Sequence, residues 1–145
     1  MIPASDKAKE RSRKNAELDG LVKRLVLARD GNACVRCGKK ILLQAAHILP
    51  KGRYPRLRFE TLNILTLCVY DHLFWAHKNP IEFTQWLEEK YPGRIQTLQE
   101  MAATARKVDM KELLIGLKLE VKALDDLPPG KLTVYEPIKD SEIPF

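Results

Sequence analysis

Three cysteines and an aspartate have the spacing of a single metal site. Cys34 and Cys37 form a Cys-x2-Cys pair, and Cys68 and Asp71 repeat this spacing after thirty intervening residues. Two such pairs supply the four ligands of a closed tetrahedral zinc site, in which a carboxylate oxygen binds at about the distance of an imidazole nitrogen. We therefore predict a structural Zn²⁺ ion here. The alternative is that Cys68 is an ordinary core residue and that Asp71 caps the following helix.

The net charge of +6 is concentrated near these ligands. Residues 31–60 carry seven Lys or Arg and one acidic residue, whereas residues 1–30 and 61–145 sum to +3 and −3 and cancel. This placement favours a polyanionic ligand at the metal cluster. Phosphate contacts that read little base identity are predicted for Lys51, Arg53, Arg56 and Arg58. The alternative is that these cations only keep a loop soluble.

Short elements are predicted to position this cluster. The order strand, basic loop, strand and helix is expected over residues 41–49, 50–61, 63–70 and 71–77, from apolar runs that Pro50 and polar residues interrupt. Gly38 after the first cysteine pair predicts a tight turn, because glycine allows the backbone that brings two thiolates to one ion.

Helices are predicted on both sides of this core. Apolar residues recur at three- and four-residue steps over residues 5–29, and Asp30-Gly31-Asn32 ends that pattern. A helix beginning at Pro80 and two more over residues 94–107 and 110–124 follow. The predicted organisation is a basic N-terminal helix (1–30), a zinc-stapled core (31–92), C-terminal helices (93–124) and a proline-rich extended tail (125–145).

Composition argues against several other classes of protein. No apolar run approaches the roughly 18 residues that span a bilayer. The first 18 residues are too charged for a signal peptide. An odd cysteine count with a Cys-x2-Cys pair argues against a disulfide framework. We therefore expect a soluble, cytoplasmic protein with no membrane partner.

The segments "AHILP", "LRFETLNILTLC" and "DHLFWAH" resemble the HNH, or ββα-metal (His-Me finger), endonucleases, especially the phage recombination type of the NinG/Rap kind. The resemblance spans about residues 28–90, including "ARDGNACVRCGKK" and "HKNPIEFTQW". Its most specific part is the ordered set Cys-x2-Cys, His, Asn, Cys, His. It implies an α+β fold in which helices flank a small zinc-stapled ββα-metal core, and the activity of a metal-dependent DNA endonuclease.

The resemblance also assigns roles to single residues. His47 takes the position of the general base, Asn63 that of the residue that orients it, and His72 that of a ligand for the catalytic Mg²⁺ or Mn²⁺ ion. A histidine suits the first role because its ordinary pKa of about 6.5 leaves it mostly neutral at pH 7. His77 would be a second ligand, but five residues along an ideal helix place it about 140° away, so the helix must end or widen.

One position departs from the family pattern. Family members usually place Asp or His immediately before the general base as a metal ligand, whereas this chain has Ala46. We expect hydrolysis of phosphodiester bonds in duplex or branched DNA during phage or prophage recombination, in the cytoplasm of the host cell, with a homodimer possible. The alternatives are a non-catalytic zinc-ribbon DNA-binding module that assists recombination and, less favoured, a structure-selective RNA-binding protein.

Overall fold

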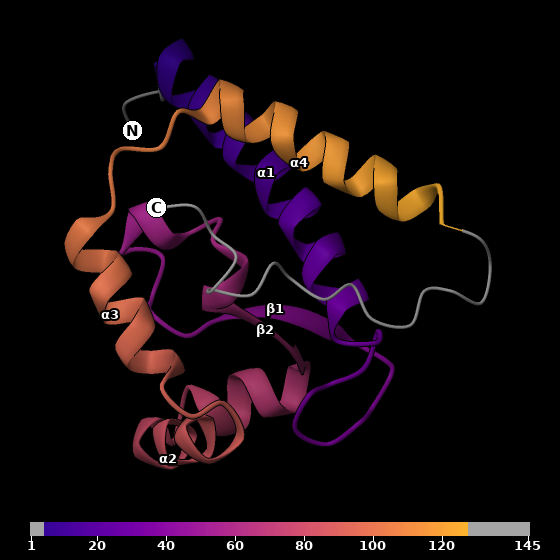
Figure 1. The fold of residues 1–145 in the computed structure, drawn as a ribbon, viewed down its shortest axis with the longest axis vertical. Coiled ribbons are helices and arrows are strands. Elements are labelled where there is room, and N and C mark those ends of the chain that lie inside the picture. Colours follow the sequence, from indigo (N-terminus) through magenta and orange to yellow (C-terminus); the bar gives the residue numbers. More distant parts are fainter. Residues whose placement is uncertain (1–4, 128–145) are drawn as a thin grey trace.

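The computed structural model describes residues 5–127 and has a small α+β fold in which helices surround a two-stranded sheet (Figure 1). The α-helices of this part are α1 (Asp6–Arg29), α2 (Pro80–Lys90), α3 (Arg94–Thr104) and α4 (Met110–Asp125). The strands are β1 (Leu43–His47) and β2 (Ile64–Cys68), and a π-helix, η3 (Tyr70–Ala76), follows β2. The predicted order of strand, loop, strand and helix is confirmed.

The two strands pair in antiparallel fashion, with Ala46 opposite Leu65 and His47 opposite Ile64. Both are shorter than the apolar runs that predicted them. Leu42 has a φ of 51°, which interrupts extended backbone just before β1. After β2, Val69 already has the backbone angles of a right-handed helix.

The basic segment between the strands is more ordered than the predicted loop. It contains two short 3-10 turns, η1 (Pro55–Leu57) and η2 (Thr61–Asn63). The fixed φ of Pro55 favours the first of them. Leu57 and Phe59 are buried and therefore anchor the segment to the core.

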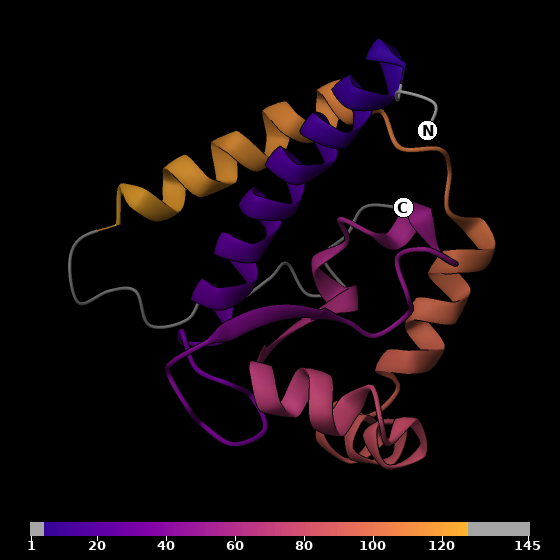
Figure 2. The ribbon, with the colours of Figure 1, turned by 180° about the vertical axis from the view of Figure 1, so that it is seen from behind.

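α1 and α4 lie side by side and pack on one side of the sheet (Figures 1 and 2). Ion pairs join Glu17 to Lys118 at 3.3 Å and Arg24 to Asp125, so both helices run in the same direction. Their shared core contains Leu18, Val22, Leu25, Val26, Leu117, Val121, Leu124 and, from β2, Ile64. The helices predicted at the two ends of the chain therefore stabilise each other.

A second core cluster lies where the strands meet η3 and α2. Ala46 of β1 and Leu67 of β2 pack there with Trp75 and Ala76 of η3. Trp75 makes edge-on contacts with Phe83 and Trp86 of α2, at centroid distances of 5.6 and 5.5 Å. The apolar side of η3 is thereby fixed against the sheet.

The helix ends differ slightly from the predicted ones. α3 ends at Thr104 instead of Lys107, and α4 extends through Asp125, the first residue of the predicted tail. Positions 128–145 of that tail lie outside the described residues. No helix within residues 5–127 is both long and apolar enough to cross a membrane.

Candidate functional site

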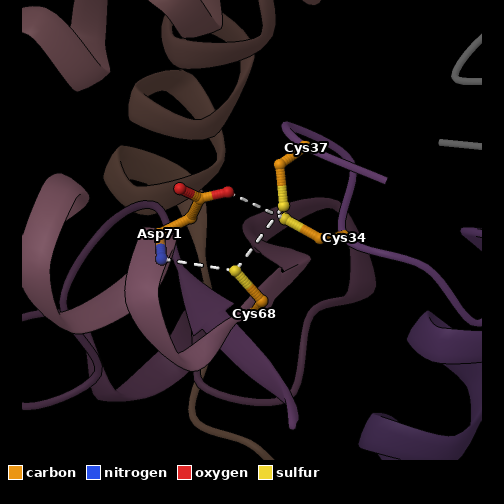
Figure 3. Close-up of side chains that lie close together, drawn as sticks. All are labelled: Cys34, Cys37, Cys68 and Asp71. Atoms are coloured by element: carbon orange, nitrogen blue, oxygen red, sulfur yellow. Dashed lines mark hydrogen bonds between the residues drawn. The ribbon is translucent and has the colours of Figure 1, made fainter. Parts of the chain in front are cut away.

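The four predicted metal ligands lie together in the structure (Figure 3). One ligand atom from each of Cys34, Cys37, Cys68 and Asp71 lies within 4.8 Å of all the others. The Sγ atoms of Cys37 and Cys68 are 3.7 Å apart, and Cys34 Sγ lies 3.2 Å from Asp71 Oδ2. Tetrahedral ligands about 2.3 Å from an ion lie about 3.8 Å from one another. The spacing therefore suits a single ion, and thiolates with one carboxylate are ligands that suit zinc.

Each half of this cluster is shaped by the local backbone. In the first, Cys34 N–H donates to the Lys39 carbonyl and Gly38 N–H to the Cys34 carbonyl, with Gly38 at a φ of 79°. In the second, the last residue of β2 is Cys68, whose Sγ accepts from the backbone N–H of Asp71 at 3.4 Å. Both backbone turns direct their ligand atoms toward the same point.

Asp71 belongs to this cluster and does not cap a helix. Val69, not Asp71, is the residue that precedes η3, and the Asp71 side chain is 2% exposed. One carboxylate oxygen lies against Cys34, and the other accepts from the Arg36 guanidinium at 2.8 Å. Burial alone would raise the pKa of Asp71, but hydrogen bonds from Cys37, Cys34 and Arg36 outweigh it and lower the pKa. The predicted alternative for Asp71 is therefore wrong.

The Cys37 thiol favours its protonated form without a cation. Desolvation, with hydrogen bonds to Asp71, Cys34 and Cys68, raises the pKa of Cys37 to about 12. Three sulfur atoms this close together repel one another when ionised. A divalent cation would displace these protons on binding, so its affinity depends on pH.

His47 is held in one tautomer at the end of β1. Its Nε2 lies 2.8 Å from the backbone carbonyl of Arg58. A carbonyl only accepts, so Nε2 carries the proton and Nδ1 keeps a free lone pair. Burial is the main reason that the pKa of His47 is lowered, and the nearby Lys51 contributes in the same direction. A neutral imidazole with a free nitrogen can act as a base near neutral pH.

Asn63 ties together the segment that carries the His47 acceptor. Its side chain is fully buried, donates to the carbonyls of Leu49 and Leu57, and accepts from the Leu49 N–H at 2.8 Å. Leu57 directly precedes Arg58, whose carbonyl holds the His47 ring. The predicted orienting residue thus acts on His47 through the backbone between the strands.

We expect Asn63→Ala to lower the free energy of unfolding by about 2–4 kcal/mol, because it leaves several buried backbone groups without partners. Urea denaturation measures the loss. Asn15→Ala on α1 is the control and should change stability little. Zinc content should stay the same, and equal stability of the two variants would contradict the role assigned to Asn63.

His72 and His77 lie next to each other because η3 is a π-helix. The His77 N–H donates to the His72 carbonyl at 3.1 Å, five residues back, which adds one residue to the turn. The two ring centroids are 4.5 Å apart. The prediction that the helix must end or widen here is confirmed by this widened turn.

Gln44 fixes the orientation of His72 and was not predicted from the sequence. Its Oε1 lies 2.7 Å from His72 Nδ1, so this nitrogen donates and Nε2 keeps its lone pair. Desolvation and the neighbouring His77 and His47 lower the pKa of His72 to about 4. His72 is therefore a neutral side chain with one nitrogen free for a cation.

We expect Gln44→Leu to weaken Mn²⁺ binding by about 10- to 100-fold, because the loss of a partner that orients a metal-binding histidine has effects of this size. Titration calorimetry with Mn²⁺ on zinc-loaded protein measures this affinity. Gln85→Leu, on the exposed side of α2, is the matched control. Unchanged Mn²⁺ affinity in Gln44→Leu would show that the bond to Gln44 does not support metal binding.

The four predicted phosphate-binding cations differ in what they contact. Arg58 forms a two-point ion pair with Asp19 of α1, at 2.7 and 3.1 Å. Arg56 donates to the Ala105 carbonyl, and Arg53 lies over the Tyr54 ring at 5.7 Å. Phosphate binding by Arg58 stays a prediction, and Asp19 competes with a phosphate for this side chain. Lys51 and Arg53 are exposed and are the better candidates.

Ala46 is buried at 2% exposure and packs in the same core cluster as Trp75 and Ala76 of η3. The position before His47 therefore faces the π-helix but offers no ligand atom.

Comparison of the chain with family models, with curated proteins and with solved structures gave no match.

Proposed function

We propose that this protein is a metal-dependent DNA endonuclease of the HNH type that hydrolyses phosphodiester bonds. The observation that carries the proposal is the π-helical turn that places His72 beside His77. An ordinary α-helix would separate these two side chains, whereas the wider turn gives two imidazoles to one cation. The same helix begins in the four-ligand cluster, for which we propose a purely structural zinc ion.

The three histidines have two parts in the proposed reaction. His47 Nδ1 takes a proton from the attacking water, while Nε2 stays bound to the Arg58 carbonyl and keeps the ring in place. His72 and His77 would hold Mg²⁺ or Mn²⁺. Such a cation, when bound, stabilises negative charge on the phosphate and on the leaving oxygen. Asn63 keeps the Arg58 carbonyl in position.

The resemblance to phage recombination nucleases supports DNA as the substrate, and so does the basic segment beside His47. A panel of divalent metals with supercoiled plasmid tests the proposal, with nicked and linear products as the readout. Cleavage with Mg²⁺ or Mn²⁺ that requires His47 is expected. Branched DNA, duplex DNA and RNA as competitors identify the substrate. A protein that cuts none of these with any metal would refute the endonuclease.

A non-catalytic DNA-binding module of recombination is the second candidate, and Ala46 favours it. Without a carboxylate or imidazole at this buried position, the proposed cation would rely on His72 and His77 among the described residues. This candidate predicts DNA binding that depends on salt, with no cleavage under any condition.

Both candidates predict that Lys51 and Arg53 contact phosphates. We expect the Lys51→Ala/Arg53→Ala double variant to reduce the slope of log affinity against log salt by about 2, since each lost phosphate contact contributes about 0.9. Binding to a fluorescent duplex across a salt series measures the slope. Lys111→Ala/Lys122→Ala on α4 removes the same charge elsewhere. Equal slopes for the two double variants would place the DNA on another surface.

A further inference from the structure

Large apolar side chains are exposed on η3 and on the segment just before β1. Tyr70 and Phe74 of η3 are 59% and 51% exposed, and their rings lie 5.9 Å apart. Ile41 and Leu42, just before β1, are 69% and 71% exposed. The Leu42 carbonyl accepts from the Val69 N–H, so Leu42 lies beside the start of η3. We name Ile41, Leu42, Tyr70 and Phe74 the apolar ridge.

One member of this ridge, Leu42, has a strained backbone conformation. Leu42 has a φ of 51°, in the left-handed region that a bulky residue rarely adopts. Two features of Leu42 are unfavourable in water. Its apolar side chain is exposed, and its backbone has a conformation that suits glycine. Strain of this kind persists where the surrounding structure imposes it, and it is concentrated at functional sites.

The charge around the ridge indicates the partner. Lys39 and Lys40 directly precede Ile41, and Lys78 Nζ lies 5.0 Å from the Phe74 ring centroid. Within residues 31–81 the carboxylates are Glu60 and Asp71, and Asp71 is buried among the metal ligands. Exposed apolar groups among unopposed cations fit a polyanion that also offers apolar surface. A second copy would bring like charges together.

We propose that the apolar ridge enters duplex DNA as a wedge that separates two neighbouring base pairs, with Phe74 at its tip. This inference rests on the proposed function, because η3 also carries His72 and His77 and would bring them to the backbone beside the opened step. Stacked bases offer the apolar surface that the ridge lacks, and the lysines meet the flanking phosphates. Pyrimidine–purine steps open most easily and would be preferred.

The test uses full-length protein with His47→Ala, so that the DNA is not cut. The probe is a short duplex with one central TpA step whose adenine is replaced by 2-aminopurine, a base that fluoresces when it is unstacked. We expect fluorescence to rise on binding. Phe74→Ser should abolish the rise and weaken binding at least about fivefold, the factor for about 1 kcal/mol at the lower end of aromatic–base contacts. Phe74→Leu should retain most of both.

Two variants keep the result interpretable. Ile115→Ser on α4 removes another exposed apolar side chain, which is 62% exposed, and should change neither fluorescence nor affinity. Leu42→Gly should raise the melting temperature by removing strain, yet should weaken DNA binding. A weaker complex formed by a more stable protein would show that the strained leucine serves the contact.

Four outcomes would decide the matter against the wedge or against the nuclease. Phe74→Ser that binds and fluoresces like its parent overturns the wedge. Binding to anionic phosphatidylserine vesicles that needs Phe74, while DNA binding does not, assigns the ridge to a membrane surface and overturns it as well. A dimer that Phe74→Ser dissociates, again with DNA binding unchanged, overturns it in favour of a second copy. A fluorescence rise that depends on Phe74, in a protein whose wild type never cleaves, supports the wedge and refutes only the endonuclease.

Discussion

Removal of the metal from the four-ligand cluster is expected to unfold the protein. We expect about one Zn²⁺ per chain, and loss of the cooperative fold on addition of a strong chelator. Structural zinc sites contribute about 10–16 kcal/mol of apparent binding free energy, whereas domains have a net stability of about 5–15 kcal/mol. Loss of the metal can therefore remove most of the stability. The second core cluster should be affected first, because Cys34 and Cys68 are part of it.

Elemental analysis and circular dichroism with and without chelator measure these two effects. Asp71→Ala should bind zinc more weakly and melt at a lower temperature, since it removes one ligand and leaves Arg36 without its ion pair. Asp126→Ala, an exposed carboxylate after α4, is the matched control. A well-folded protein that contains no zinc would disprove this assignment of the cluster.

The metal cluster could be predicted from the sequence because its signal is local. Each half is a pair of ligands with two residues between them, and ligand chemistry then requires the halves to meet. The helices were predicted for a similar reason, since their apolar spacing is visible within single segments. The register of the strands and the parallel packing of α1 on α4 depend on contacts between distant segments, and no short pattern indicates them.

The residues that were missed or misjudged all have partners distant in sequence. Gln44 reaches His72 across 28 positions, from strand to helix. Arg58 appeared to be a free cation, but Asp19 lies opposite it in the fold, 39 positions earlier. The sequence predicted only that the helix must end or widen, and it did so from a requirement of chemistry, that His72 and His77 share one side. No propensity of Tyr70–Ala76 signals the wider turn, and Trp75 and Ala76 of this segment pack in the second core cluster.

His47→Ala is expected to abolish DNA cleavage while leaving DNA affinity nearly unchanged. A general base contributes about 10²–10⁴-fold to rate and acts on the transition state, not on the binding of phosphate. His77→Ala should instead raise the Mn²⁺ concentration needed for cleavage, because a lost ligand first costs cation affinity. Single-turnover cleavage of plasmid across a Mn²⁺ series separates the two effects, and a fluorescent duplex reports affinity.

The pH dependence of the wild type gives an independent check on the same residue. A base works only when it is unprotonated, and burial sets the pKa of His47 below its ordinary value of 6.5. Cleavage should therefore remain high at pH 6.5 and decline only as the pH falls through this lower pKa. Arg58 contributes to the lowered pKa through its charge, although its carbonyl opposes the effect. Undiminished cleavage by His47→Ala, or an acid limb well above pH 6.5, would mean that another group accepts the proton.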